Sequence, residues 1–293
     1  MPEYALSSSE FHLFRDLIYK LTGIVLSDAK RQMVQGRLQK RLRYHKMERF
    51  EEYCRLIAKE GENSEELTEF INCLTTNKTD FFREAHHFDF VAESIIPGFI
   101  QRASLGEAPR RIRVWHAGCS TGEEPYSLAI TLAEALEGHG NWDIRQLASD
   151  IDTKVLAHAE QGVYEAEKLA PVPKALLRKH FLRGRDDKSD LFKVKPFLQE
   201  RIAFRQINLL DKQWPIHSSV KFDMIFCRNV VIYFDKPTQK TLFARFQQYL
   251  RPGGHLFIGH SESLLGVSDA FQSLGGTIYR LPEPMEAIRK NAA

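Results

Sequence analysis

The chain has 293 residues, of which 43% are hydrophobic and 27% are charged, a composition typical of a soluble globular protein with one large or two modest domains. Its 41 basic and 38 acidic residues give a net charge of +3, which is too small to indicate nucleic-acid binding by itself. The four cysteines are scattered, with no metal-binding spacing, so we expect reduced thiols and no metal site. The first residues lack the pattern of a signal sequence, and no apolar run is long enough for a membrane span. We therefore expect a cytoplasmic protein without membrane insertion.

The first part of the chain predicts a series of helices. Between residue 8 and about residue 95, apolar side chains recur at helical spacing. We expect Ser9 to cap the first helix and Gly23 to end it. A polar linker follows at about residues 103–111. These limits predict a helical N-terminal domain over residues 1–102.

The second of these helices is strongly basic. Seven Lys and Arg residues and no acidic residue lie between Lys30 and Lys46, and Lys30, Arg37 and Arg41 lie near one face at helical spacing. A solvated surface helix usually mixes both charges, so a docking surface for an acidic partner is the sharper of two hypotheses. RNA would also fit, but a pattern of stacking aromatic residues interleaved with the charges is missing.

A polar segment with a Phe-Phe pair connects the helices to the rest of the chain. It runs from residue 75 to residue 84 and contains Asn77, Thr79 and Arg83. Polar groups beside two large apolar side chains indicate a segment that leaves one domain and touches the next. Asn77 and Thr79 would alternatively cap the helix that follows.

A strand, a glycine turn and a helix follow one another between Arg113 and Ser127, which is the nucleotide-binding corner of a doubly wound α/β sheet. Only Gly118 and Gly122 occur before the helix, which argues against a dinucleotide fingerprint, and no Lys follows Gly122 as a phosphate-binding loop requires. The acids Glu123 and Glu124 would repel phosphates but suit a ligand with ammonium, sulfonium and ribose hydroxyl groups. S-adenosylmethionine (SAM) has all three. The alternative is an ordinary strand-to-helix turn.

Polar residues also end the later strands of this expected sheet. Asp150 follows the second strand, where such folds bind a ribose hydroxyl, although it or Asp152 would alternatively cap the next helix. Residues 162–204 break the alternation of strands and helices, and we expect a small antiparallel subdomain inserted there. Asn208 and Leu209 follow the third strand, where they would hold an adenine edge and face.

The fourth strand, residues 222–227, is nearly all apolar and ends at Arg228 and Asn229, with Tyr233 close behind. Charged and amide groups at the end of a buried strand are costly unless they are used, so this is a second candidate site. The triplet His260-Ser261-Glu262 has the letters of a catalytic trio, but adjacent residues seldom form one.

Several of these segments resemble one known family. The stretch LRPGGHLFI is similar to class I SAM-dependent methyltransferases. LTTNKTDFFRE, STGEEPYS, SDID, INLL, FCRNVVIYF and GHSES are similar, in order and spacing, to the chemotaxis receptor methyltransferase family, CheR. The resemblance covers essentially the whole chain. It implies an all-α N-terminal domain followed by a Rossmann-like doubly wound methyltransferase domain over residues 103–293, with an inserted antiparallel β-subdomain.

The resemblance also implies an activity and a set of site residues. The family transfers methyl groups from SAM to glutamate side chains on the cytoplasmic helices of chemoreceptors, and the glutamyl methyl esters serve chemotactic adaptation. Its basic N-terminal helix is implied to face the receptor, and Arg83 and Tyr233 to lie near the transferring methyl. The implied SAM-binding residues are Asn77, Thr79, Arg83, Glu124, Asp150, Asn208, Leu209, Arg228 and Asn229.

Three points stay open at this level. In some family members the inserted subdomain binds a receptor C-terminal peptide through a loop that tends to contain glycines, whereas this loop reads GRDDKSD with Gly184 alone. An RNA or small-molecule methyltransferase is an alternative within the enzyme class. A SAM-binding regulator without catalysis is an alternative outside it.

Overall fold

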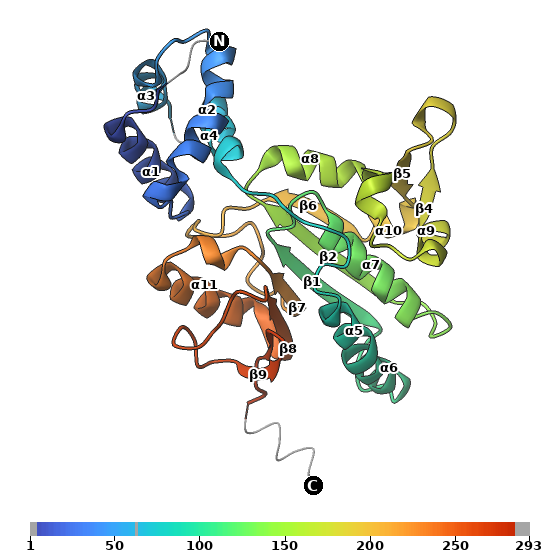
Figure 1. Ribbon diagram of the computed structural model, residues 1–293. Coiled ribbons are helices and arrows are strands. Elements are labelled where there is room, and N and C mark those ends of the chain that lie inside the picture. The colour runs from blue at the N-terminus through green and yellow to red at the C-terminus, as the bar shows by residue number, and fades with distance from the viewer. Residues whose placement is uncertain (1–4, 62–63, 285–293) are drawn as a thin grey trace.

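The computed structural model describes residues 5–61 and 64–284. Four helices form the N-terminal part, namely α1 (Ser8–Thr22), α2 (Arg31–His45), α3 (Phe50–Lys59) and α4 (Glu65–Leu74), with a 3-10 turn, η1 (Asp28–Lys30), before α2. Their apolar faces meet in one core that includes Phe14, Leu38 and Phe70. Figure 1 shows these helices as a separate bundle beside the sheet.

The first helix is capped differently from our expectation. Ser7, and not Ser9, is the N-cap, because its side chain accepts the Glu10 N–H while the Glu10 side chain accepts the Ser7 N–H. This reciprocal pair is a capping box. The expected end at Gly23 is confirmed, and its φ of 72° is the left-handed conformation that glycine adopts without strain.

A second group of helices packs on the sheet and not on the N-terminal bundle. It comprises α5 (His86–Phe90), a π-helical turn η2 (Val91–Ile95) and α6 (Ile96–Ser104). Phe88, Val91 and Phe99 share a core with residues of the central strands. We therefore propose that the domain boundary falls near residue 76, not at residue 102, because these helices bury their apolar faces against the second domain.

A seven-stranded sheet forms the second domain, in the order β6-β2-β1-β7-β8-β10-β9. The first five strands of that order are parallel, and β10 is antiparallel to both of its neighbours, β8 and β9. The strands are β1 (Arg111–Ala117), β2 (Asp143–Asp150), β6 (Ile202–Gln206), β7 (Phe222–Cys227), β8 (Leu250–Ile258), β9 (Gln272–Gly275) and β10 (Ile278–Arg280). The order reverses between β1 and β7, so their carboxyl ends flank a topological switch point, where such sheets bind ligands.

Helices cover both faces of this sheet, as the doubly wound fold requires (Figure 1). Helix α11 (Lys236–Tyr249) packs with Trp115 and Ile225 on one face, whereas α7 (Glu123–Ala135) packs with Val114 and Met224 on the other. Neighbouring residues of β1 and β7 thus point to opposite faces and are buried on both. Helix α8 (Thr153–Gln161) connects β2 to the insertion.

The insertion is a three-stranded antiparallel sheet, β3-β5-β4. Its strands are β3 (Val163–Glu165), β4 (Phe181–Arg183) and β5 (Leu191–Val194), and its short helices are η3 (Ala166–Leu169), α9 (Lys174–His180), η4 (Asp186–Lys188) and α10 (Pro196–Gln199). Residues 202–204 pair in parallel with β2. We therefore propose that the inserted subdomain ends near residue 200, because the chain has rejoined the main sheet by Ile202.

None of the helices in the described ranges combines the length and the apolar character needed to span a lipid bilayer.

Candidate functional site

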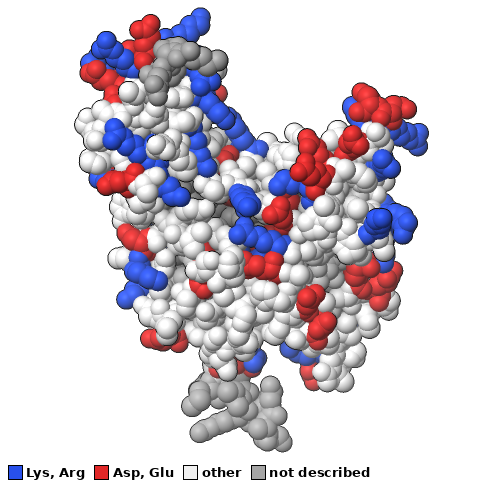
Figure 2. Space-filling view, in the orientation of Figure 1, with Lys and Arg blue, Asp and Glu red and all other residues white. Residues whose placement is uncertain are grey.

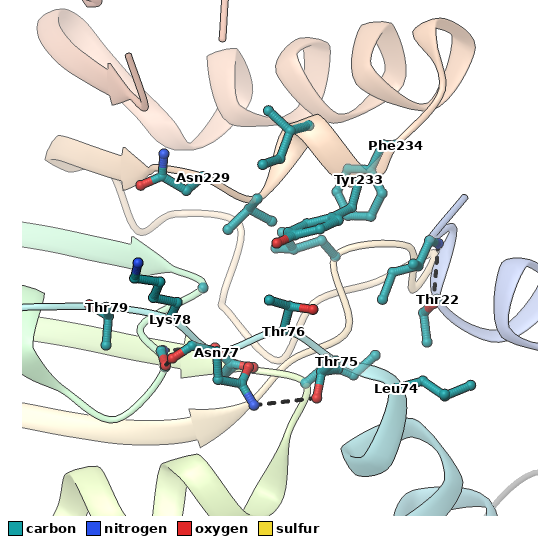
Figure 3. Close-up of a pocket in the computed structure, with 18 of the residues that line it drawn as sticks. Thr22, Leu74, Thr75, Thr76, Asn77, Lys78, Thr79, Asn229, Tyr233 and Phe234 are labelled. Carbon is teal, nitrogen blue, oxygen red and sulfur yellow. Dashed lines mark hydrogen bonds between the residues drawn. The ribbon is translucent and has the colours of Figure 1, made fainter. Parts of the chain in front are cut away.

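A cavity of about 530 Å³ lies at the carboxyl ends of the parallel strands, at the switch point between β1 and β7. The loop between α1 and α2 closes one side of it and the linker after α4 another (Figure 3). Every residue expected to bind SAM or to take part in the chemistry lines this one cavity. They are Asn77, Thr79, Arg83, Glu124, Asp150, Asn208, Leu209, Arg228, Asn229 and Tyr233.

The glycines of the turn after β1 are required by packing within the protein. Gly118 and Gly122 have φ angles of 103° and 96°, which disfavour other residues. A Cβ at Gly118 would lie 2.3 Å from Cγ2 of Val230, and one at Gly122 would lie 2.9 Å from Cβ of Ala159. Gly118 also lines the cavity, so its packing against Val230 fixes the turn at the edge of the site.

Asp150 is a buried carboxylate at the end of β2. One of its oxygens accepts the Ser120 N–H at 2.8 Å and the other accepts the Asp152 N–H at 3.0 Å. Burial raises the pKa of Asp150 to about 6, although these backbone hydrogen bonds oppose the shift. Asp152, and not Asp150, caps α8 by accepting the Lys154 and Val155 N–H groups. The Asp150 carboxylate is thus left facing the cavity.

Asp152 also holds the linker against the sheet. Its second carboxylate oxygen accepts hydrogen bonds from Asn77 Nδ2 at 2.7 Å and Thr75 Oγ1 at 2.8 Å, and the Ser120 hydroxyl donates to the Asn77 carbonyl at 2.8 Å. Figure 3 shows Asn77 and Thr75 side by side at the edge of the cavity. The N-cap of the next helix is Ala85, so the alternative that Asn77 or Thr79 caps that helix is wrong.

Arg228 is the centre of a buried network of charges. Its side chain is 2% exposed, and its guanidinium pairs with Glu124 at 3.0 Å and with Glu84 at 3.2 Å. Glu124 in turn contacts His116 Nδ1 at 2.8 Å, and Glu84 contacts His260 Nδ1 at 2.7 Å. The network therefore fixes the two charged groups, Arg228 and Glu124, that line the cavity.

The network keeps both acids ionised. Burial would raise the pKa of Glu84, but the hydrogen bond with His260 and the charge of Arg228 outweigh it and lower this pKa to about 2. The pKa of Glu124 is also lowered, because contacts with His116 and Arg228 outweigh its burial. Sequence reasoning assigned no role to Glu84, His116 or His260. The one indication in the sequence was His116, a polar residue in the otherwise apolar end of β1.

Arg83 and Tyr233 line the cavity from different segments, the linker after α4 and the loop after β7. Arg83 Nη1 donates to the Lys78 carbonyl at 3.0 Å. Tyr233 ends the 3-10 turn η5 (Val231–Tyr233), and its carbonyl accepts the Val25 N–H at 2.8 Å. In Figure 3 the Tyr233 ring projects into the cavity across from Thr76. Lys78 thus holds the Arg83 side chain and Val25 holds the main chain at Tyr233, and both residues line the cavity.

Left-handed backbone conformations cluster around the cavity. Four of the seven non-glycine residues with positive φ in the described ranges belong to its walls or flank them, namely Phe82, Glu84, Ser120 and Asn229, with φ between 49° and 58°. Each such residue costs of order 1–3 kcal/mol, and such costs concentrate at functional sites. Phe82 and Glu84 flank Arg83, so the contacts that hold these two conformations also fix the turn that carries Arg83.

Asn208 has a structural contact that sequence reasoning missed. Its Nδ2 donates to the Leu21 carbonyl at 2.7 Å, and its Oδ1 accepts the Leu210 N–H at 3.0 Å. The side chain therefore joins the N-terminal bundle to the sheet domain at the cavity edge. The sequence does not reveal this role, because the contact with Leu21 joins residues that are far apart along the chain.

The cationic side chains of the basic helix differ in what they contact: some bind other parts of the protein and others are exposed to solvent. Arg41 does not offer its charge to a partner, because its side chain is 11% exposed and pairs with Glu66 and Glu69 of α4. Arg37 donates to the carbonyls of Leu74 and Thr75 at 2.9 and 2.7 Å. Lys30 is exposed at the cavity edge. Figure 2 shows Lys and Arg side chains on both sides of the hollow between the N-terminal helices and the sheet domain.

Comparisons with known proteins agree over residues 9–280. The family model described as "CheR methyltransferase, SAM binding domain" matches residues 77–280, and "CheR methyltransferase, all-alpha domain" matches residues 9–75. "Chemotaxis protein methyltransferase 2" of Pseudomonas aeruginosa is 44% identical over 279 residues, which cover 94% of each chain. "Chemotaxis protein methyltransferase" of Salmonella typhimurium is 45% identical over 94% of this chain and 91% of its own length. The protein of the same name from Escherichia coli is 44% identical over 94% of this chain and 92% of its own length.

Proposed function

Because the chain belongs to the CheR methyltransferase family, we propose that it methylates glutamate side chains on the cytoplasmic helices of chemoreceptors, forming glutamyl methyl esters. The family membership and the relatives make the chain a SAM-dependent methyltransferase of chemotaxis. The glutamate acceptor, the receptor and a cytoplasmic location are the parts that we propose.

The observation that carries the proposal is the gathering of acid and amide side chains at the switch point of the sheet. Asp150 ends β2 and Glu124 lies in the first turn of α7, which follows the neighbouring strand β1, and both line one cavity. A buried carboxylate at the end of β2 suits ribose hydroxyl donors, and an ionised Glu124 suits an ammonium or sulfonium group. The residues present therefore fit SAM, and we propose that Asp150 binds its ribose and Asn208 and Leu209 its adenine.

The chemistry makes small demands on the protein. When bound, SAM supplies a methyl group activated by its positively charged sulfur, and a glutamate carboxylate with an ordinary pKa of about 4.3 accepts it without a general base. The bond from methyl to sulfur breaks as the bond from methyl to oxygen forms, and no proton moves. The protein's contribution is placement, which supplies up to about 7–11 kcal/mol of a barrier.

We propose that Arg83 and Tyr233 provide this placement. Both line the cavity, where the Lys78 carbonyl accepts from the Arg83 guanidinium and the Tyr233 carbonyl accepts from the Val25 N–H. A guanidinium binds a carboxylate in a defined plane, so Arg83 would orient the substrate carboxylate or that of the methionine moiety. The Tyr233 ring would confine the acceptor on its path to the methyl group.

The proposed receptor-binding surface is the basic helix predicted from the sequence, with one residue removed from the predicted set. We propose that Lys30 and Arg37, which line the cavity, face the acidic receptor helices. Arg37 keeps its net charge because its partners are neutral carbonyls, whereas the Glu66 carboxylate neutralises the charge of Arg41, so we leave Arg41 out of this set. A receptor C-terminal peptide stays a further candidate partner for the inserted subdomain.

One experiment tests the proposal. The protein is incubated with SAM labelled in the methyl group and with receptor cytoplasmic fragments, with and without their last five residues, and the product is treated with base. We expect label in the receptor that base releases as methanol, because esters hydrolyse in base and amides and methylated bases do not. Label only in RNA or a small molecule would contradict the proposal, as would SAM binding without transfer to any receptor.

A further inference from the structure

The segment that follows β8 braces the loop that carries Tyr233. Glu262 is buried, at 6% exposure. Its carboxylate accepts three backbone N–H groups, from Gly259 at 2.5 Å, Asn229 at 3.0 Å and Ile232 at 3.2 Å. Two of these donors belong to the loop after β7, so one side chain bridges the ends of two neighbouring parallel strands.

This carboxylate is costly to bury. Within residues 5–61 and 64–284, no Lys, Arg or His forms an ion pair with Glu262. Burial raises the pKa of Glu262, and the hydrogen bonds from the backbone oppose that rise. A buried acid without a cation is kept only where its hydrogen bonds satisfy groups that would otherwise be unpaired. Here those groups are the main-chain amides of the loop.

The loop that these bonds hold is strained and tightly packed. Asn229 has a φ of 58°. A Cβ added at Gly259 would lie 2.8 Å from the Asn229 backbone nitrogen, so the two segments touch with no room for a side chain. The loop therefore needs fixed partners to keep its conformation, and Glu262 supplies them at both of its ends.

The same loop delivers side chains to the cavity. Asn229 begins it and Tyr233 ends it, and both line the cavity. Ile232, whose N–H Glu262 accepts, is the immediate neighbour of Tyr233. Glu262 itself does not line the cavity, so any effect it has on the reaction must pass through the loop.

We propose that Glu262 is a positioning residue for methyl transfer, which sets the place of the Tyr233 side chain through its hydrogen bonds to Asn229 and Ile232. The inference rests on the proposed function, because it assigns Tyr233 to the path of the acceptor. It gives a role to the His260-Ser261-Glu262 triplet, which the sequence left without one.

The variant Glu262→Gln tests this role. Its amide group would point N–H donors at backbone N–H donors, so at least one of the three bonds is lost. We measure kcat and KM with labelled SAM and a receptor fragment, the affinity for S-adenosylhomocysteine (SAH) by calorimetry, and the melting temperature. Because misplacement of about 1 Å costs up to about 100-fold in rate, we expect kcat to fall by about 10- to 100-fold. We expect KM for the receptor and the SAH dissociation constant to change less than kcat does.

Glu134→Gln is the matched control. Glu134 is also a glutamate paired with its surroundings, Lys179 and His180, but it does not line the cavity. Its variant should keep the wild-type kcat. If Glu262→Gln does not bind SAH in stoichiometric amounts, Glu262→Asp takes its place, since it keeps the charge but shortens the reach.

The outcomes separate the inference from the function it rests on. If the wild-type protein methylates no receptor, the proposed function fails before any variant is compared. If the wild type is active and kcat of the variant stays within about twofold of it, the positioning role is wrong. A loss of rate that only matches the loss of SAH-binding sites would reduce Glu262 to a folding role and would also overturn the inference.

Discussion

The buried Asp150 carboxylate predicts that SAH binding weakens on acidification. The perturbation is a change from pH 8 to pH 5, across the raised pKa of about 6. We expect the ionised carboxylate to accept the ribose hydroxyls, so that protonation removes an acceptor from the site. Glu84 and Glu124, whose pKa values are lowered, stay ionised over this range and do not contribute to the effect.

The magnitude follows from the pKa. With a pKa of about 6, roughly 99% of Asp150 is ionised at pH 8 and roughly 9% at pH 5. If only the ionised form binds, the SAH dissociation constant rises by about tenfold, or about 1.4 kcal/mol. Salt-dependent surface effects are much smaller for a carboxylate that is 9% exposed.

The free energy of unfolding of the ligand-free protein should change in the opposite direction, because acidification increases the contribution of Asp150. The folded pKa of about 6 lies above the ordinary value of 3.8. Folding therefore favours protonated Asp150. The stability from this group is fully present below about pH 4 and is lost as the pH rises through 6. The difference of about two pH units corresponds to about 3 kcal/mol. Acidification thus stabilises the fold through Asp150 while it weakens ligand binding.

Calorimetry of SAH binding between pH 5 and pH 8 is the assay. Asp150→Asn should bind SAH more weakly at pH 8 and should lose most of the pH dependence. Glu123→Gln is the matched control, because burial also raises the pKa of Glu123 but the residue lies outside the cavity. Its variant should keep the wild-type slope. A flat wild-type profile, or an unchanged slope in Asp150→Asn, would refute the reasoning.

Three further predictions follow from other parts of the molecule. Arg41→Ala should lower the free energy of unfolding by about 3–5 kcal/mol, because it leaves Glu66 buried without its main cation; urea unfolding measures this, with the exposed Arg43→Ala as a control that should change little. Arg83→Ala should lower methyl transfer at saturating SAM by at least about tenfold, and near wild-type turnover would remove Arg83 from the mechanism. Lys30→Glu should raise the receptor KM several-fold without changing SAH affinity, and an equal effect of Lys46→Glu, at the far end of α2, would argue against a local contact.

The sequence predicted the sheet domain well because its signals are local. The apolar run at residues 222–227 corresponds to β7 (Phe222–Cys227), and the strand, turn and helix around Gly118 and Gly122 lie where their residue types indicated. The carboxyl ends of parallel strands share one edge, so side chains that follow them meet. That rule brings Asp150, Asn208 and Asn229 to one cavity, whereas Asn77, Thr79 and Arg83 follow a helix and were implied by the family resemblance alone.

The points that the sequence could not decide are those where a residue's partner is remote along the chain. Helical spacing placed Arg41 beside Lys30 and Arg37, but no periodicity reveals that Glu66 of another helix accepts its charge. The bounds of the insertion depended on whether residues 202–204 pair with β5 or with β2, which alternation alone does not decide. In each case a tertiary contact overrode a correct local pattern.

The missed residues share a second property, which is that they touch the cavity only through another residue. Glu84 and His116 hold Arg228 and Glu124, and Glu262 holds the loop of Tyr233. A motif search finds residues whose side chains can bind a ligand directly. These residues bind another side chain or the backbone of the protein, so their residue types do not indicate which ligand the site takes. Their cost is visible instead, as buried charge and left-handed backbone close to the cavity. Because a fold of marginal stability retains such costs only where something depends on them, buried acids with unusual partners are where further positioning residues of this enzyme should be sought.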